Sequence, residues 1–534
     1  MAKRGNKWSV VIILACAQFI MVLDSTVMNV SISEVVKDLN TSVSGLQAAI
    51  TFYTLTMAAF MLTGGKMGDI WGRLRAFRIG AVIYAVGSLI TSLSPNLGVL
   101  MVGWSLIEGL GAVLVIPAIA ALIAMNYKGK DRVIGYTLIG AASGIAVAAG
   151  PLIGGWVTTY LSWRYVFAAE TVIMAIVLLS SGAIVEKRSK VRAKAIDIPS
   201  VILSASGMAL LVYGILQSKV WGWVTPQGAM QINGHDITPL GISMVSYLIL
   251  AGVLVLRAFY LRQQRLEESG GNPLLQVSMF QIKVLRSGLA VLGAQYLVIA
   301  AIFFVMPIYL QMVLGLDALQ TGIKIFPLSV SIVIFSLLGS RFIDRFTPRQ
   351  IVRAGQLLLV VGSVIVLAAI DPDLKRITFA IGMLVLGAGL GLLASQIGNI
   401  TMSSVSEDKT SEVGGLQGTF QNFGSSLGTA LVGSVMIAQL TTGFVSSINQ
   451  NPDIPQSVKT SVDEKSKTGV PIVSSAEVEQ YAINAGLPQS EAQSIADSYK
   501  ASQLTSLKNS MFAVAVLGLA AMVLSRNIPN KKLV

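Results

Sequence analysis

Apolar segments of 20 or more residues recur along almost the whole chain, separated by short polar or glycine-rich stretches. A helix that crosses the hydrocarbon core of a bilayer needs about 20 mostly apolar residues. Read in this way, the segments predict fourteen membrane-spanning helices. Only 12% of the residues are charged, which is about half the share found in soluble proteins. The sequence therefore predicts an all-α polytopic membrane protein and excludes a soluble enzyme or a disordered chain.

Basic residues are concentrated in alternate loops, beginning with the N-terminal segment 1–7. Lys and Arg accumulate in the cytoplasmic loops of membrane proteins. The net charge of +13 is therefore explained by the orientation of the chain in the membrane. We expect both termini in the cytoplasm and a location in the cell membrane. We expect no nucleic acid partner. One predicted cytoplasmic loop departs from this rule, because Glu407, Asp408 and Glu412 make it acidic.

The residue types that build most catalytic and metal sites are scarce in this chain. It contains one cysteine, Cys16, and one histidine, His235, so it can form neither an internal disulfide nor a His/Cys metal cluster. The phosphate-binding pattern G-x-x-x-x-G-K-[ST] does not occur. We expect a protein that is not an enzyme and that uses no metal and no cofactor.

The loops divide the predicted helices into three groups. Residues 65–75 and 339–349 both place Gly, Asp and Arg in a short cytoplasmic loop, as two related halves of one protein would. Residues 1–190 would form a six-helix bundle, residues 191–270 two inserted linker helices, and residues 271–534 a second six-helix bundle. Paired bundles are typical of transporters with a site near the middle of the membrane.

A long polar region, about residues 441–509, lies between the last two predicted spans. Ser474 and Glu477 are typical of a helix start, and Gly486 and Pro488 of a helix end. A second polar helix would follow from about residue 490, separate from the last membrane span. We expect an external helical hairpin; a loop without helices is the alternative.

Three acidic residues lie inside predicted membrane helices. Asp24 and Glu108 fall near the middle of the membrane, and Glu170 is expected closer to its outer surface. Ionisable groups in such positions are costly and usually functional. A carboxyl group removed from water favours its protonated form, whereas a nearby cation favours the ionised form. These residues could therefore exchange protons for a cationic substrate; alternatively, they only hydrogen-bond to neighbouring helices.

Small, polar and aromatic residues mark further helix surfaces. Residues 140–155, which include Pro151, and residues 414–428 place glycines at spacings that allow close helix packing. Aromatic side chains could add cation–π contacts to a substrate cavity. The candidates for lining such a cavity, or equally for packing between helices, are Tyr53, Trp104, Phe303, Phe304, Gln417, Gln421 and Asn422.

Several short motifs follow a recognisable pattern. They include L-D-S-T-V-M-N-V at 23–30, whose acid is Asp24, W-R-Y-V-F at 163–167 and Y-L-Q-M-V-L-G at 309–315. A glycine-rich loop and a glycine-rich helix complete the pattern: Gly65, Gly68, Asp69, Gly72, Arg73 and Arg75 in the loop, and Gly144, Gly150, Pro151, Gly154 and Gly155 in the helix. Together these motifs resemble the major facilitator superfamily and, within it, the fourteen-helix drug:proton antiporters of the quaternary-ammonium and multidrug exporter type. The loop is similar to that family's gating motif and the helix to its antiporter motif.

The resemblance implies a function and a mechanism. Such a protein would export lipophilic, cationic drugs across the cytoplasmic membrane by alternating access, in exchange for protons and driven by the proton gradient. Its partners would be a small amphipathic cation, protons and membrane lipids. Asp69, Arg73 and Arg75 would hold the cytoplasmic side closed in the outward-facing state.

The sequence departs from the antiporter pattern at three positions. Ser105 and Glu108 stand where the family has Arg and, three residues later, Gln, and Glu170 stands where Asn is usual. The cavity would therefore be more anionic than in the family, which favours cationic cargo. Two alternatives stay open: a transporter of the same fold for lipids, lipid-linked compounds or metabolites, and a membrane receptor or partner-binding protein.

Overall fold

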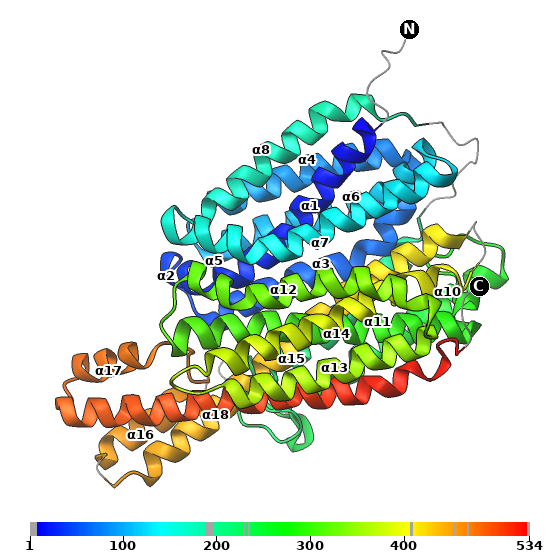
Figure 1. Ribbon diagram of the computed structural model, residues 1–534. Coiled ribbons are helices and arrows are strands. Elements are labelled where there is room, and N and C mark those ends of the chain that lie inside the picture. Colours follow the sequence, from blue (N-terminus) through cyan, green and yellow to red (C-terminus); the bar gives the residue numbers. More distant parts are fainter. Residues whose placement is uncertain are drawn as a thin grey trace.

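The computed structural model describes residues 8–186, 196–228, 230–232, 235–405, 409–452, 454–466 and 469–530. Within these ranges fourteen helices are long and apolar enough to cross a membrane, as predicted. They run side by side, and the start of α1 (Ser9–Val30) and the end of α18 (Gln489–Ala521) lie at the same end of the molecule, which we call the termini end (Figure 1). The opposite end, from which α16 (Gln456–Lys465) and α17 (Ser475–Asn484) project, is called the hairpin end.

The first six spans form the N-terminal bundle. A break at Ser31 separates the first helix from a short continuation, and a π-helical turn interrupts the fourth span. The elements are α1 (Ser9–Val30), α2 (Ile32–Asp38), α3 (Val43–Trp71), α4 (Arg73–Ser92), α5 (Leu97–Leu100), π-helix η1 (Met101–Glu108), α6 (Gly109–Asn126), α7 (Gly129–Tyr160), α8 (Arg164–Ser180) and η2 (Ser181–Ala183).

Two linker helices and the C-terminal bundle follow. The linker contains α9 (Ile198–Trp221), the antiparallel strands β1 (Met230–Ile232) and β2 (His235–Ile237), η3 (Pro239–Gly241) and α10 (Met244–Glu268). The C-terminal bundle contains η4 (Val277–Gln281), α11 (Lys283–Ile308), π-helix η5 (Tyr309–Val313), α12 (Ala318–Arg341), η6 (Phe342–Asp344), α13 (Pro348–Ala369), α14 (Arg376–Met402), α15 (Thr410–Gln450), α18 (Gln489–Ala521) and η9 (Met522–Asn527).

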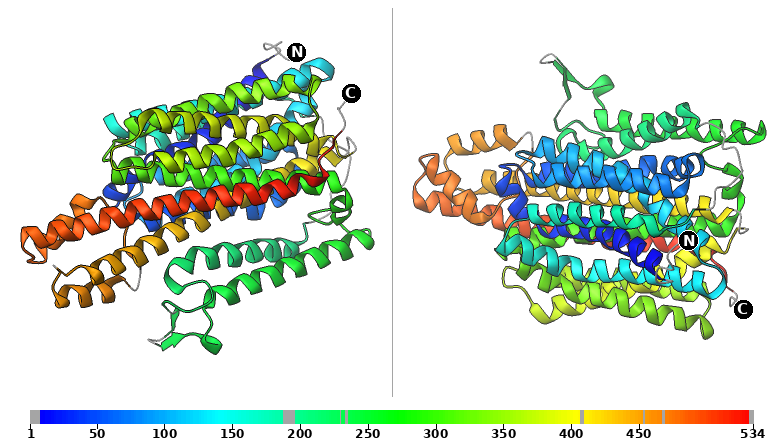
Figure 2. Two further views of the ribbon diagram at one scale, coloured as in Figure 1. Left: turned by 60° about the horizontal axis from the view of Figure 1, so that its bottom comes forward. Right: turned by 90° about the horizontal axis from the view of Figure 1, so that it is seen from above.

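The two bundles meet along α3 and α15 and along α7 and α12. The linker helices α9 and α10 pack on each other at one flank, where α9 also contacts α3 and α15 (Figure 2). This arrangement is compatible with the three predicted groups, whose boundaries stay a prediction. The boundary at residue 190 lies outside the described residues.

Glycines allow α7 to approach helices of both bundles. A β-carbon at Gly150 would lie 1.9 Å from the Thr26 hydroxyl oxygen of α1, and one at Gly155 would lie 2.6 Å from the Ala318 carbonyl oxygen of α12. Larger residues would force these helices apart, so the glycines have the close-packing role that their spacing predicts. Among the other motif positions, Gly154 lies close to Val27, whereas Gly144 has more room.

The projecting region is helical, as expected, but its last helix does not end where the sequence predicts. The Ser474 and Glu477 capping box is present at the start of α17. The polar helix predicted from residue 490 and the last membrane span are one continuous helix, α18, so their separation was wrong. The reason is local: no proline interrupts residues 489–521, and a change from polar to apolar residues does not end a helix.

The linker pair is joined at the termini end by Asp197, directly before α9. Asp197 accepts the backbone N–H of Ser200 at 3.1 Å and caps the helix. It also accepts two hydrogen bonds of 2.7 Å from the Arg262 guanidinium of α10. These Arg262 bonds, with those from Ser200, lower the pKa of the Asp197 carboxyl to about 2.

We expect Asp197→Asn to lower the melting temperature of the detergent-purified protein at pH 7 by a few degrees, because Asn keeps a capping acceptor but loses the charged pair. A lowered folded-state pKa stabilises the fold above the ordinary value of 3.8, and this contribution is lost as the pH falls toward about 2. The difference in melting temperature between wild type and Asp197→Asn should therefore be constant above about pH 4 and become smaller below it. Exposed Asp497→Asn is the control; equal melting of wild type and Asp197→Asn would contradict the prediction.

Candidate functional site

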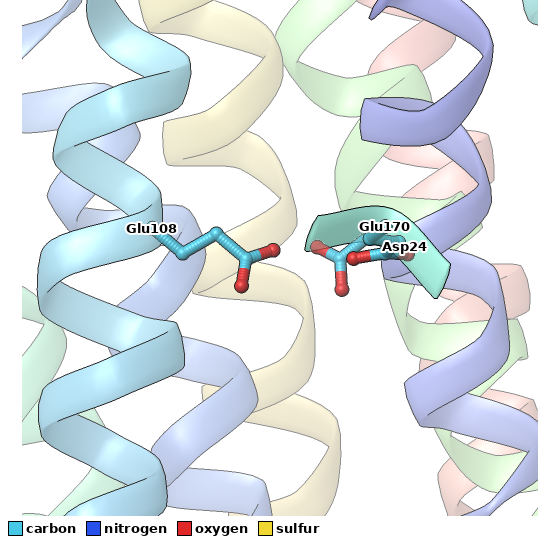
Figure 3. A group of neighbouring side chains, drawn as sticks. All are labelled: Asp24, Glu108 and Glu170. Carbon is cyan, nitrogen blue, oxygen red and sulfur yellow. The ribbon is translucent and has the colours of Figure 1, made fainter. Parts of the chain in front are cut away.

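The three predicted intramembrane acids lie together. Asp24 of α1, Glu108 at the end of η1 and Glu170 of α8 each offer a carboxylate oxygen, and these oxygens lie within 4.8 Å of one another. All three side chains are buried and point toward one another (Figure 3). We call this group the carboxyl cluster. The expectation that Glu170 lies nearer the surface was wrong, because counting residues along each helix ignores helix tilt and the reach of a glutamate side chain.

Helix α4 lies against the cluster because glycines remove the side chains between them. A β-carbon at Gly87 of α4 would lie 2.5 Å from the backbone nitrogen of Glu108. A β-carbon at Gly111 of α6 would lie 2.5 Å from the backbone nitrogen of Tyr84. This close contact brings Tyr84 and Ser88 of α4 to the acids.

Two neutral donors bind part of the cluster. The Trp104 indole N–H donates to both carboxylate oxygens of Asp24, at 2.9 and 3.1 Å. The Ser88 hydroxyl donates to Oε2 of Glu108 at 2.9 Å. Neutral donors orient the carboxyl groups without cancelling their charge, so the charge must be balanced in another way.

The remaining oxygens of the cluster are unpartnered. Among the described residues, Oε1 of Glu108, both carboxylate oxygens of Glu170 and the hydroxyl of Tyr84 have no hydrogen-bond partner. None of the ion pairs in the described part of the chain includes a cluster acid. Three negative charges this close repel one another strongly when water is excluded. The cluster can therefore hold protons or a cation that comes from outside, and its geometry would also admit a metal ion.

Ser105, at the position where the antiporter pattern has Arg, makes its hydrogen bond outside the carboxyl cluster. Its hydroxyl donates to the Ala49 carbonyl of α3 at 2.8 Å. The residue thus joins two helices of the N-terminal bundle and brings no positive charge to the carboxyl cluster.

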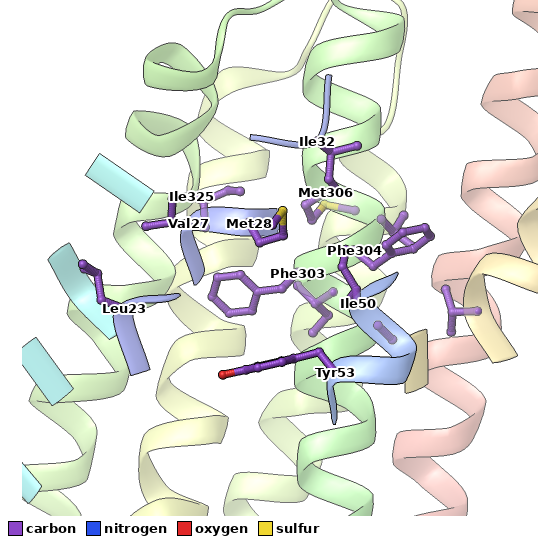
Figure 4. Close-up of a cluster of buried hydrophobic side chains, with 14 of the residues drawn as sticks. Leu23, Val27, Met28, Ile32, Ile50, Tyr53, Phe303, Phe304, Met306 and Ile325 are labelled. Carbon is purple, nitrogen blue, oxygen red and sulfur yellow. The ribbon is translucent and has the colours of Figure 1, made fainter. Parts of the chain in front are cut away.

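Aromatic rings cover the cluster. Tyr53 of α3 stacks on Trp104, with ring centroids 4.6 Å apart and an angle of 10° between the planes. In Figure 4 the Phe303 ring lies between Met28 and Tyr53, within a buried apolar layer formed by both bundles. Phe304 is buried against Gly433 of α15. Tyr53 thus belongs both to the stack on Trp104 and to this apolar layer.

The three polar candidates of α15 lie elsewhere in the bundle. Gln417 donates to the Gly398 carbonyl at 3.1 Å and to the Thr401 hydroxyl, both on α14. Asn422 donates to the Gly418 carbonyl of its own helix at 2.9 Å. Gln421 is half-buried. In this conformation Gln417 and Asn422 use their amides within the C-terminal bundle, and their cavity-lining role stays a prediction.

The predicted gating motif forms the turn between α3 and α4 at the termini end. Gly72 joins the helices with a φ of 96°, a left-handed conformation that favours glycine. Arg73 forms an ion pair with Asp69 and binds the Gly65 carbonyl at 3.2 Å. The Glu186 carboxylate accepts the first N–H groups of α4, and the Arg75 side chain is exposed.

An ion pair crosses between the bundles at the same end. Lys66 of α3 lies 3.6 Å from the Glu412 carboxylate in the first turn of α15. This contact accounts for one of the three acidic residues in the loop that departs from the charge rule. The other two, Glu407 and Asp408, lie outside the described residues.

The bundles are also joined at the hairpin end, through the break in α1. Gln311 of η5 donates to the Val30 carbonyl at 2.6 Å and accepts the Ser33 N–H at 3.1 Å. A helix break leaves such backbone groups without helical partners. The Gln311 amide provides both a donor and an acceptor, so it satisfies both of them from the opposite bundle.

A second bond of this kind lies beside the first. The Thr159 hydroxyl of α7 accepts the Leu319 N–H in the first turn of α12, at 3.1 Å. A β-carbon at Gly322 would lie 2.1 Å from the Pro151 carbonyl oxygen, so the helices touch here. We call the contacts of Gln311 and Thr159 with the opposite bundle the hairpin-end seam.

The residues of these sites that were not predicted from the sequence include Tyr84, Ser88, Glu186 and Gln311. Tyr84 and Ser88 are polar residues four apart in a predicted span, a spacing that puts them on one helix face. Gln311 lies in the 309–315 motif, as an amide within an apolar stretch. Both patterns could have predicted these residues from the sequence. Nothing in the sequence around Glu186 indicates that it caps α4.

Comparison with known proteins places the chain in a family. The model of the Major Facilitator Superfamily matches residues 14–429. The chain is 28% identical over 433 residues to a puromycin resistance protein of Streptomyces alboniger, covering 80% of this chain and 81% of that protein. It is 27% identical over 453 residues to a probable actinorhodin transporter of Streptomyces coelicolor, covering 83% and 75%. It is 25% identical over 426 residues to the multidrug resistance protein Stp of Mycobacterium tuberculosis, covering 79% and 74%.

Solved structures share the fold. A bacterial homologue of the human lysosomal transporter Spinster, in an inward-facing and unoccupied conformation, superposes with a TM-score of 0.61 at 13% identity, covering 98% of both chains. A D-xylose–proton symporter superposes with a TM-score of 0.56 at 13% identity, covering 81% of this chain and 90% of its own. With a family model that matches most of its length and a fold that agrees, the chain belongs to the Major Facilitator Superfamily of membrane transporters.

Proposed function

We propose that this transporter is a proton-coupled antiporter that exports amphipathic cations across the cytoplasmic membrane. The observation that carries the proposal is the carboxyl cluster: three buried acids within 4.8 Å and no ion-paired cation on any of them among the described residues. Such a cluster can be neutral when protonated and can bind a cation when its protons leave. Protons and substrate then compete for the same oxygens, which couples their movements.

The names of the relatives support export of small molecules. They include a puromycin resistance protein, a probable actinorhodin transporter and a multidrug resistance protein. A transporter of this kind would need neither a cofactor nor catalytic chemistry of its own, since the proton gradient would supply the energy. The excess of Lys and Arg in alternate loops supports a cytoplasmic termini end and an external hairpin end.

Two sets of contacts between the bundles support alternating access. The hairpin-end seam closes the external side, and the Lys66–Glu412 ion pair joins the cytoplasmic side. Opening to either side would require one set to break while the other holds. Asp69 and Arg73, which lie beside this ion pair in sequence and form their own pair, would stabilise the cytoplasmic contact, as would Arg75.

Replacing one cluster acid by its amide removes a charge and keeps nearly the same shape. We expect Asp24→Asn, Glu108→Gln and Glu170→Gln each to slow proton-driven efflux of a lipophilic amine by about tenfold or more, because each removes a proton-exchanging group. Proteoliposomes with an imposed pH gradient and an internal pH dye would measure efflux and proton flux together. The exposed Asp373→Asn is the matched control. Normal, proton-coupled efflux by all three cluster variants would refute the coupling assignment.

Gln311→Leu should open the hairpin-end seam, because the Val30 carbonyl and the Ser33 N–H lose their partner. The test is the reaction of a reporter cysteine with an impermeant maleimide added outside, in a Cys16→Ser background with buried Ile32→Cys as reporter. We expect several-fold faster labelling. Gln311→Glu should increase the labelling rate in the same way, because an ionised carboxylate cannot donate a hydrogen bond to the Val30 carbonyl.

The matched control for this test is Gln356→Leu. Gln356 is also a buried amide, but it donates to the Ala521 carbonyl within the C-terminal bundle. Its loss should leave the labelling rate unchanged. If Gln311→Leu labels no faster than its parent, the Gln311 bonds do not hold the seam closed.

A further inference from the structure

The carboxyl cluster is short of hydrogen-bond donors as well as of positive charge. Trp104 donates to both oxygens of Asp24, and Ser88 donates to one oxygen of Glu108. Three buried acceptor atoms remain, one on Glu108 and two on Glu170. The fully buried Tyr84 hydroxyl lies beside Glu108 and Glu170 and has one O–H to donate, which is too few for three acceptors. The site therefore lacks several hydrogen bonds that its ligand must complete.

Protons can supply these missing donors, since each protonated carboxyl group carries an O–H. A substrate that replaces the protons has to replace the donors too, because a buried acceptor left without a partner is costly. A quaternary ammonium ion would restore the positive charge but has no N–H. A protonated amine would restore both.

The size of the cluster also suits an ammonium group. Hydrogen bonds from an ammonium to carboxylates are about 2.8 Å long and leave the nitrogen in tetrahedral directions, so two accepting oxygens lie about 4.6 Å apart. The cluster oxygens lie within 4.8 Å of one another. A metal ion such as Mg²⁺, whose ligand oxygens lie about 3 Å apart, fits within the same limit, so competition by metal ions is part of the test.

The aromatic surfaces that could bind a quaternary ammonium are already in use. Cation–π binding needs an open ring face. One face of Tyr53 is stacked on one face of Trp104, with ring centroids 4.6 Å apart, and each residue is only 1% exposed. The indole N–H of Trp104 is engaged with Asp24. Binding at this point thus depends on hydrogen bonds to oxygen.

We propose that the carboxyl cluster selects organic cations with two or more N–H donors, such as protonated primary amines and amidines, over quaternary ammonium ions of the same size. The selection rests on the export function proposed above. Glu108 and Glu170 accept the N–H groups, and Tyr84 acts as a specificity residue that completes the hydrogen bonds around the ligand.

The experiment compares a lipophilic primary amine with its N,N,N-trimethyl analogue, both fully charged at pH 7. Efflux from proteoliposomes under one pH gradient gives kcat/KM for each. We expect a preference of about tenfold or more for the primary amine, because the analogue leaves buried acceptors unpaired. Tyr84→Phe should reduce this preference several-fold by slowing the amine alone. Tyr213→Phe, on the linker helix α9, should leave it unchanged.

The outcomes separate the two proposals. Equal kcat/KM for both compounds would overturn donor selection and leave cation export standing. Failure of the folded, monodisperse protein to move either compound would overturn the export function. A preference that Tyr84→Phe leaves intact would remove Tyr84 from the site. Competition by millimolar Mg²⁺ or Ca²⁺ stronger than by the primary amine would assign the oxygens to a metal ion instead.

Discussion

The exclusion of water from the carboxyl cluster is the constraint on which the rest of this structure depends. A negative charge in such a place is tolerated only with donors and a compensating charge. The chain provides the donors through Trp104 and Ser88. In the function that we propose, protons or a cationic substrate compensate the charge. The helix packing around the site follows from this need, since Gly87 and Gly111 bring α4 close enough for Ser88 to reach Glu108.

The same lack of water makes backbone groups sensitive to conformation. The break at Ser31 frees a buried carbonyl and a partly buried N–H, and Gln311 binds both from the opposite bundle. Separation of the bundles at the hairpin end would expose these groups, and an opening to water would hydrate them. Breaking the hydrogen bonds of the seam therefore costs little free energy only when water enters from that side and hydrates the exposed groups.

Local patterns predicted what depends on short stretches of chain. The number of spans follows from the length of apolar segments, and the start of α17 from the Ser474 capping box. The continuous α18 differs from the prediction, because a change from polar to apolar residues does not by itself end a helix. The depth of Glu170 was misjudged because it depends on helix tilt, which has no local signal. The acidic Glu412 had no explanation until its contact with Lys66 was seen.

By itself the sequence determined that the chain lies in a membrane, which segments cross it, and that three acids lie within those segments. These properties follow from the transfer of each segment from water into lipid, which depends only on local composition. Tertiary structure alone decided that the acids meet, that their neighbours are Trp104, Ser88 and Tyr84, and that Gln311 binds backbone groups of the opposite bundle. Such contacts join residues far apart in the chain, and they form only where small residues let the helices approach.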